Sequence, residues 1–342
     1  MPNHITHTSV GARSIFNLLG WRRHGRFDVR SQFDHELQIP TRAAHDRVTS
    51  YAARMTDSRL MVLEDGRDLG WLEIGDPQGH PILAFHGTPG SRLQMAIGDD
   101  DMRQAGVRLV CVDRPGYGLS TFQPHRRLVD WPRDVVQLAD HLDIERFAVM
   151  GVSGGGPHSS VCAALLGDRV TAAAVVSGVG PLDDPAATEG MMASNRAVGS
   201  LARRAPWALR PLAATQIAIY RRWPLQGIDL MKRQLPAADV ALLDRTDVRE
   251  LFERDVTRAS RTTARAMVQD FEVFTGPWGF DPGSITIPVH IWQGDEDVNV
   301  PPNHARLQHA AIPGSVLHWL PGEGHLYCID RMSEIASVLV AA

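Results

Sequence analysis

The chain carries a series of short, almost wholly apolar runs, each four or five residues long and each followed by turn residues. Such runs are typical of strands that lie buried on both faces of a parallel sheet, because neither face of such a strand meets solvent. The runs are Ile82–Phe85, Leu109–Val112, Phe147–Met150, Ala172–Val176, Val289–Trp292 and Val316–Leu320. We therefore expect a parallel sheet at the centre of the fold.

Helical patterns separate these runs along the chain. Val129–Leu142 places apolar residues at helical spacing, and Gly155–Leu166 is rich in small and apolar residues. Pro302–Ala311 and Arg331–Val340 are expected to form later helices. Two further strand-like runs flank Asp65-Gly66, a hairpin-type turn signal. This alternation predicts an α/β fold with a doubly wound, mostly parallel sheet.

The alternation breaks between residues 183 and 280, where the chain becomes rich in arginine and acidic residues. Asp239–Leu251 and Arg261–Phe274 have helical patterning in this stretch. We expect residues 183–280 to form an inserted helical cap, and residues 58–182 and 281–342 to form the α/β core. Prolines within the cap predict short helices, because proline ends or kinks a helix. They are Pro206, Pro211, Pro224 and Pro236.

Composition excludes several classes of function. With 44% hydrophobic and 22% charged residues among 342, the chain can bury a large core, and its net charge of −4 gives no basic field for a nucleic acid. No stretch of 18 apolar residues is present, so stable membrane insertion is not expected. Three cysteines at irregular spacing form neither a disulfide framework nor a zinc motif, which favours a reducing, cytoplasmic setting.

The N-terminal residues 1–57 are expected to be a separate extension. Residues 1–27 contain four arginines and no acidic residue, interspersed with apolar side chains. This composition would suit a basic amphipathic segment that lies on a surface or touches a membrane. We favour the simpler interpretation, a plain extension that packs on the body of the protein or is disordered.

One short motif is the strongest indication in the sequence of what chemistry the protein performs. Gly151-Val152-Ser153-Gly154-Gly155 is a G-x-S-x-G pattern that follows an apolar strand and opens a small-residue helix. A sharp strand-to-helix turn leaves no room for side chains at the flanking glycines, and it holds the serine in a strained conformation. The turn also puts Ser153 at a helix N-terminus, where the helix dipole favours developing negative charge.

In this context the chain resembles the α/β-hydrolase superfamily over about residues 58–182 and 281–342. Five motifs occur in that family's order: His86-Gly87-Thr88-Pro89-Gly90, Asp113-Arg114-Pro115-Gly116-Tyr117-Gly118, the elbow at Ser153, Gly294-Asp295-Glu296-Asp297, and Gly322-Glu323-Gly324-His325. The resemblance implies a serine hydrolase with a helical cap, similar to esterases and proline iminopeptidases. Serine at the elbow, where related dehalogenases and epoxide hydrolases use aspartate, implies acyl transfer.

The resemblance implies a catalytic triad of Ser153, His325 and Asp297. Serine is a weak nucleophile until a base removes its proton, and imidazole titrates near neutral pH. Asp297 would hold the imidazole in the correct tautomer. Its neighbours Asp295 and Glu296 are rivals for this role, and the family spacing favours Asp297. Some relatives place the acid after the sixth strand instead, where Asp183 and Asp184 lie.

Two backbone N–H groups, those of Thr88 and Gly154, are expected to form the oxyanion hole. His86 is expected beside the substrate as an orienting residue rather than as a second base. In the cap, Met191, Trp207 and Trp223 are expected to line a pocket for an acyl or alcohol group. Asp113 and Arg114 are expected to order neighbouring loops.

Three functions follow as hypotheses. The first is a carboxylic-ester hydrolase that forms an acyl-serine intermediate on a small-molecule ester or acyl substrate. The second is a proline-iminopeptidase-like aminopeptidase, in which Glu189, Asp183 or Asp184 would hold the substrate's free amine. The third is a non-catalytic ligand-binding protein that has kept the fold. No cofactor or metal is expected, because no zinc-ligand spacing, P-loop or dinucleotide fingerprint occurs. The sequence indicates neither the oligomeric state nor the natural substrate.

Overall fold

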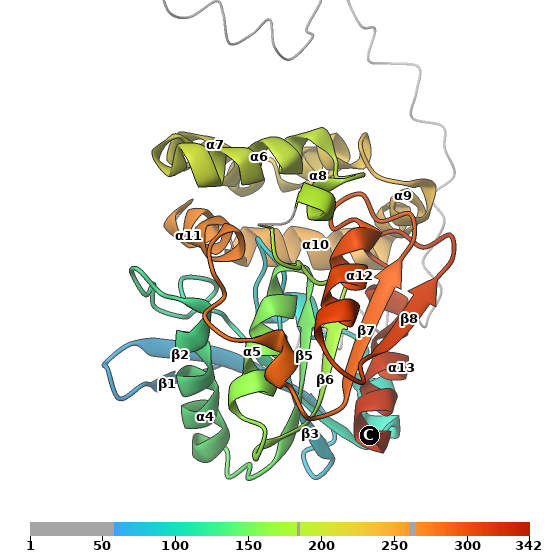
Figure 1. Ribbon diagram of the computed structural model, residues 1–342. Helices are drawn as coiled ribbons and strands as arrows, with labels where there is room; N and C mark the ends of the chain where they lie inside the picture. Colours follow the sequence, from blue (N-terminus) through green and yellow to red (C-terminus); the bar gives the residue numbers. More distant parts are fainter. Residues whose placement is uncertain (1–57, 183–184, 260–263) are drawn as a thin grey trace, which may run out of the picture. The chain divides into compact units, whose positions relative to one another are not determined.

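The computed structural model describes residues 58–182, 185–259 and 264–342. This part of the chain contains an eight-stranded sheet in the order β1-β2-β4-β3-β5-β6-β7-β8 (Figure 1). β2 pairs antiparallel with β1 and with β4, and all other pairs are parallel. The strands are β1 (Arg59–Val62), β2 (Asp68–Gly75), β3 (His80–Phe85), β4 (Val107–Val112), β5 (Phe147–Val152), β6 (Val170–Val176), β7 (Val289–Gly294) and β8 (Val316–Leu320). The predicted doubly wound, mostly parallel sheet is confirmed.

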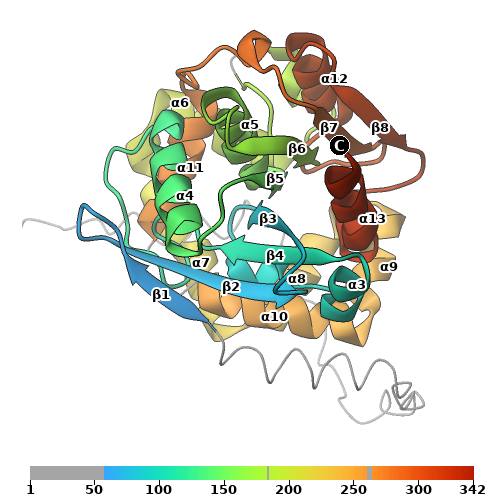
Figure 2. The ribbon, with the colours of Figure 1, turned by 90° about the horizontal axis from the view of Figure 1, so that it is seen from below.

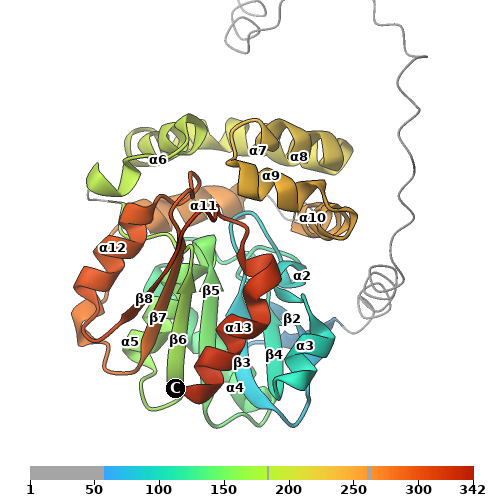
Figure 3. The same ribbon diagram turned by 90° about the vertical axis from the view of Figure 1, so that its right-hand side faces the viewer.

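Helices cover both faces of this sheet (Figures 2 and 3). On one face lie α4 (Trp131–His141), α5 (Gly156–Leu165) and α12 (Pro302–Ala311); on the other lie α3 (Asp99–Gln104) and α13 (Cys328–Ala341), and the short α2 (Arg92–Met95) follows β3. The helices expected in the core all form, and α13 begins three residues before the predicted Arg331.

The pleat of β5 explains why its sequence is apolar throughout. Phe147 and Val149 belong to the cluster under α4 and α5, whereas Ala148, Met150 and Val152 belong to the cluster under α3 and α13. Successive side chains of a strand point to opposite faces, so a strand covered on both faces needs apolar residues at every position. The strand therefore delivers the next residue, Ser153, to the C-terminal edge of the sheet.

Six helices lie beyond that edge and are called the cap helices below: α6 (Ala193–Arg204), α7 (Pro206–Arg222), α8 (Pro224–Lys232), α9 (Ala237–Asp244), α10 (Thr246–Ala259) and α11 (Ala264–Thr275). α10 and α11 lie next to the ends of the strands, and α6 and α7 lie farther out (Figures 1 and 3). The domain boundaries at residues 57, 182 and 280 stay a prediction, and the 1–57 extension, Asp183 and Asp184 lie outside the described residues.

Two expectations for the cap helices were wrong. The predicted helix Asp239–Leu251 is two helices, because Arg245 adopts an extended backbone with ψ 135° and ends α9. The prolines do not keep every helix short: α7 is 17 residues long with Pro211 inside it. Its packing against α6 and α11 offsets the backbone hydrogen bond that proline removes. None of the helices in the described part of the chain has the length and apolar composition needed to cross a membrane.

Candidate active site

Ser153 occupies a tight turn between β5 and α5. Its φ of +54° lies in the left-handed region, which a residue with a side chain adopts only under strain. A Cβ atom on Gly151 would lie 2.1 Å from the carbonyl oxygen of Gly155, and one on Gly155 would lie 2.1 Å from that of Phe85. Glycine is therefore required at both positions, since the backbone segments pack directly against each other.

His325 follows β8, and Asp297 lies in the loop after β7. His325 Nδ1 lies 2.7 Å from Asp297 Oδ2, and both residues are buried. The other carboxylate oxygen of Asp297 accepts the backbone N–H groups of Asn299 at 2.8 Å and Val300 at 2.9 Å. Because Nδ1 faces a carboxylate, it carries the proton, and Nε2 is left as the basic atom.

The surroundings of His325 raise its pKa. Burial by itself lowers the pKa of the imidazole, but the charge and hydrogen bond of Asp297 and the charge of Asp239 outweigh it. The rival acids Asp295 and Glu296 are exposed, and Asp295 instead accepts the backbone N–H of Gly322 at 2.7 Å. Of the three acids in this loop, the structure brings Asp297 to His325.

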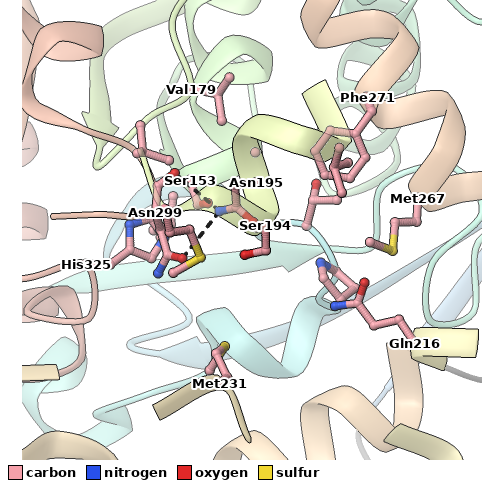
Figure 4. A pocket seen from close by; sticks show the side chains of 18 of the residues that line it. Ser153, Val179, Ser194, Asn195, Gln216, Met231, Met267, Phe271, Asn299 and His325 are labelled. Carbon is pink, nitrogen blue, oxygen red and sulfur yellow. Dashed lines mark hydrogen bonds between the residues drawn. The ribbon is translucent and has the colours of Figure 1, made fainter. Parts of the chain in front are cut away.

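Ser153 and His325 both line one cavity of about 610 Å³ between the sheet edge and the cap helices. Figure 4 shows both residues among the lining side chains. The rest of the lining is mostly apolar, with polar groups such as Asn195 and Gln216 and the charged side chains of Arg196, Arg203 and Asp255. The structure thus places the expected nucleophile and base on one concave, largely apolar space, as in a small-molecule site.

Thr88 and Gly154 are direct neighbours beside Ser153. A Cβ atom on Gly154 would lie 2.3 Å from Thr88 Oγ1, so only glycine fits there. The preceding N–H, that of Gly87, already donates to Gln94 Oε1 at 2.6 Å. Both Thr88 and Gly154 line the cavity. Their backbone N–H groups stay the predicted oxyanion donors.

His86 lies beneath this loop and does not line the cavity. Its Nδ1 donates to the Gly87 carbonyl at 2.8 Å, and its Nε2 accepts the backbone N–H of Arg114 at 3.0 Å. Burial, with the nearby charge of Arg114, holds the pKa of His86 well below its usual range, so the ring is neutral. The expectation of substrate contact is corrected, because both ring nitrogens are used to hold the loop.

The three cap residues expected around the substrate have different positions. Met191 is buried and lines the cavity. Trp207 and Trp223 do not line it: they are 75% and 52% exposed, at the two ends of α7. The expectation for the tryptophans is corrected, because α7 turns Leu209, Ala213 and Ile217 inward.

A buried charge cluster joins the cap helices to the Thr88 loop, and the sequence analysis missed its acid. Asp270, on α11, accepts hydrogen bonds from Arg114 Nη1 at 2.8 Å and Thr88 Oγ1 at 2.5 Å, and also from Tyr117 and Arg126. Burial raises the pKa of Asp270, but the two arginines outweigh it and hold the pKa below its usual range. Arg114 also donates to the carbonyls of His86 and Gly87, as expected of a loop-ordering residue.

Replacing Asp270 with asparagine is expected to destabilise the fold by about 3–5 kcal/mol, because two buried arginines lose their counter-charge. Urea unfolding followed by circular dichroism measures this loss. Asp229→Asn is the matched control, since Asp229 pairs with Arg249 at a carboxylate that is 54% exposed. That change should cost under about 1 kcal/mol. Equal effects of the two substitutions would contradict the structural role of Asp270.

A second cap carboxylate, also missed, holds the loop of His325. Asp239 on α9 is fully buried and accepts the backbone N–H groups of His325 at 2.9 Å and Leu326 at 2.8 Å. A Cβ atom on Gly324 would lie 2.4 Å from this carboxylate, so the glycine allows the approach. Asp239 therefore positions His325 through its backbone, and its negative charge near the imidazole adds to that of Asp297.

Asp239→Asn should lower kcat/KM about 10²-fold, because its amide nitrogen would face one of the two N–H groups and displace the His325 loop. The loss of a negative charge near His325 also favours the neutral imidazole. The acidic limb of the pH profile of kcat/KM should therefore move to lower pH. Asp244→Asn, at an exposed carboxylate on the same helix, should leave the limb in place. If the acidic limb of the pH profile does not move in Asp239→Asn, the role of Asp239 is structural and does not include the pKa of His325.

Comparison with known proteins agrees with this geometry. The family model described as "alpha/beta hydrolase fold" matches residues 80–331. The uncharacterized hydrolase YcgS of Bacillus subtilis is 27% identical over 282 residues, covering 81% of this chain and 95% of that protein. A proline iminopeptidase of Xanthomonas citri is 35% identical over 102 residues, and the match covers 27% of this chain and 30% of the iminopeptidase.

Among solved structures, an esterase from Exiguobacterium antarcticum has a TM-score of 0.60 at 16% identity, and the match covers 83% of this chain and 99% of that one. At 16% sequence identity, this similarity shows a shared fold and nothing about a shared activity. Since the family model spans most of the chain, including the strand ends that carry Ser153, Asp297 and His325, the chain belongs to the α/β-hydrolase fold family.

Proposed function

We propose that this protein is a serine hydrolase that cleaves carboxylic esters through an acyl-serine intermediate. The observation that carries the proposal is that Ser153, at a strained turn, and His325, bonded to Asp297, open onto one cavity. A nucleophile and a base on one pocket, with the base oriented by a third group, is the arrangement that acyl transfer requires.

In the proposed reaction, Ser153 Oγ attacks the ester carbonyl carbon while His325 Nε2 takes the hydroxyl proton. Asp297 stabilises the imidazolium that forms. The carbonyl oxygen becomes an oxyanion, which accepts hydrogen bonds from the N–H groups of Thr88 and Gly154, each contributing about 3–4 kcal/mol. The imidazolium then protonates the departing alcohol. Water, deprotonated by His325 Nε2, attacks the acyl carbon, the bond to Ser153 Oγ breaks to release the acid, and His325 returns the proton to Ser153 Oγ.

The lining of the cavity supports an apolar acyl or alcohol group as the bound part of the substrate. Met191, just before α6, and Met267 and Phe271, on α11, are among the side chains that line it. Apolar walls with a few polar groups bind such a group by removing its surface from water. Among the acidic side chains that the structure describes, Asp255 alone lines the cavity, so an uncharged ester fits better than an amine.

The second candidate is the aminopeptidase, favoured by the identity to the proline iminopeptidase of Xanthomonas citri. It needs a carboxylate for the substrate's amine. Glu189 is exposed and does not line the cavity. Asp255, on α10, does line it, but it already accepts the Ser91 hydroxyl at 2.6 Å, and burial raises its pKa to about 7. A carboxyl that is partly neutral at pH 7 is a weak amine site, which favours the ester.

Hydrolysis of p-nitrophenyl esters from acetate to palmitate, with prolyl-2-naphthylamide alongside, tests both candidates. Ester turnover with an optimum at intermediate chain length is expected. Turnover of the amide alone would support the aminopeptidase. If nothing is turned over and a fluorophosphonate probe leaves the folded protein unlabelled at Ser153, the non-catalytic binding protein is the remaining hypothesis.

A further inference from the structure

The outer cap helices have an unusual charge distribution. From Met191 to Ile228 the sequence contains no aspartate or glutamate. Six arginines lie on α6 and α7 in this stretch, and all are exposed: Arg196, Arg203, Arg204, Arg210, Arg221 and Arg222. This gives a single-sign field on a protein whose net charge is −4.

These arginines are not paired with the acidic side chains that the structure describes. Among the residues that the structure describes, none of the six forms an ion pair with an acidic side chain. The neighbouring helix α10 differs, since Arg249 pairs with Asp229 on α8. Arg196 and Arg203 donate hydrogen bonds to the carbonyls of Met191 and Leu182, and the remaining four arginines present their charge to solvent.

Large apolar side chains lie exposed on the same helices and on the adjoining α8. Trp207 is 75% exposed, Leu212 53%, Trp223 52% and Leu230 54%. Exposed tryptophan is costly in water, whereas its amphipathic ring suits the interface between lipid headgroups and acyl chains. Figures 1 and 3 show α6, α7 and α8 on the side of the cap helices that faces away from the sheet.

The catalytic cavity reaches this surface. Leu212 and Leu230 are more than half exposed and also line the cavity that contains Ser153. Arg196 and Arg203 of α6 line it as well. The cavity thus has an apolar wall that continues to the basic outer surface.

We propose that the outer surface of α6–α8, defined by the six arginines and by Trp207, Leu212, Trp223 and Leu230, docks on an anionic lipid bilayer. The arginines would bind anionic headgroups, and the tryptophans and leucines would enter the interface without spanning the membrane. The cavity would then take an acyl substrate from that surface; this second part rests on the proposed ester hydrolysis, whereas the docking does not.

Charge disfavours two other occupants, a second copy of the chain and residues 1–27. A second copy of the chain, docked through the same surface, would bring twelve arginines together without counter-charge. Residues 1–27 contain four arginines and no acid, so they would be repelled as well. A nucleic acid would match the charge and would find stacking faces at Trp207 and Trp223, but the aliphatic Leu212 and Leu230 at the cavity mouth favour lipid, and an oligonucleotide is therefore included in the test.

The test is co-sedimentation of the full-length protein with sucrose-loaded vesicles of phosphatidylcholine and phosphatidylserine in a 70:30 ratio, at 50 and 300 mM NaCl. Binding that weakens at high salt and is lost on pure phosphatidylcholine is expected. Arg210→Gln with Arg221→Gln should lower the partition coefficient roughly 30-fold. Trp207→Ala with Trp223→Ala should lower it at both salt concentrations.

The matched control is Arg59→Gln with Arg133→Gln, two exposed arginines of the core. This variant should bind as wild type does, and so should Ser153→Ala, whose binding separates docking from catalysis. Equal loss in the core and outer-surface variants, wild-type binding by the outer-surface variants, or tighter binding to a single-stranded oligonucleotide than to the vesicles would overturn the proposal.

Discussion

Ser153→Ala is expected to lower kcat for a p-nitrophenyl ester by about 10⁵–10⁶-fold, because the acyl-enzyme can no longer form. Serine hydrolases retain some rate after loss of the nucleophile, since the oxyanion donors and the pocket still act on the bound ester. The residual activity should therefore exceed the rate in buffer alone. KM should change much less than kcat, because the hydroxyl contributes little to ground-state binding.

The matched control for this substitution is Ser194→Ala. Ser194 lines the same cavity from α6, so it meets the same substrate without the strained turn or the neighbouring oxyanion loop. Its loss should change kcat less than about tenfold, the effect of one hydrogen bond. Full labelling of Ser153→Ala by a fluorophosphonate, or retention of ester turnover, would show that another residue is the nucleophile.

Asp297→Asn should lower kcat about 10⁴-fold. Asparagine keeps the shape of the side chain, but its amide can donate to His325 Nδ1 and so leave the proton on Nε2, the atom that must accept it from serine. The pKa of His325 should fall as well, because the charge of Asp297 is a principal cause of its rise. The acidic limb of the remaining activity should therefore lie at lower pH.

Asp295→Asn separates the two neighbouring acids. Asp295 is exposed and contacts the Gly322 N–H, so its loss should leave kcat within a few-fold of wild type. Collapse of turnover in Asp295→Asn with a normal rate in Asp297→Asn would reverse the assignment. A large fall in both would indicate that the loop between β7 and α12, rather than one carboxylate, sets the rate.

The core could be predicted because its signals are local. Each strand buried on both faces needs a continuous apolar run, and the turn at Ser153 needs glycine at positions 151 and 155 where a Cβ atom would clash. These requirements appear in the sequence as patterns a few residues long. The positions of His325 and Asp297 then follow from where their strands end.

The cap could not be predicted to the same depth because its determinants are distant in sequence. Asp239 lies 86 residues from the N–H that it binds, and Asp270 lies 156 residues from Arg114. In the sequence, nothing near Asp239 or Asp270 distinguishes either from other acidic residues on helices. The apolar residues of α7 posed a similar problem: nothing local indicated that Leu209 turns inward while Trp207 turns outward.

The two cap carboxylates have a consequence for how the protein exchanges ligands. Asp239 accepts a hydrogen bond from the backbone N–H of His325, and Asp270 accepts one from the hydroxyl of Thr88. If the cap helices swung away as a hinged lid, the loops that carry His325 and Thr88 would lose these hydrogen bonds, and the buried Arg114 and Arg126 would lose their counter-charge. We therefore expect the cap helices to stay in place while a ligand enters or leaves. Substrate and product are then expected to enter and leave between side chains such as Leu212 and Leu230, without movement of the cap helices.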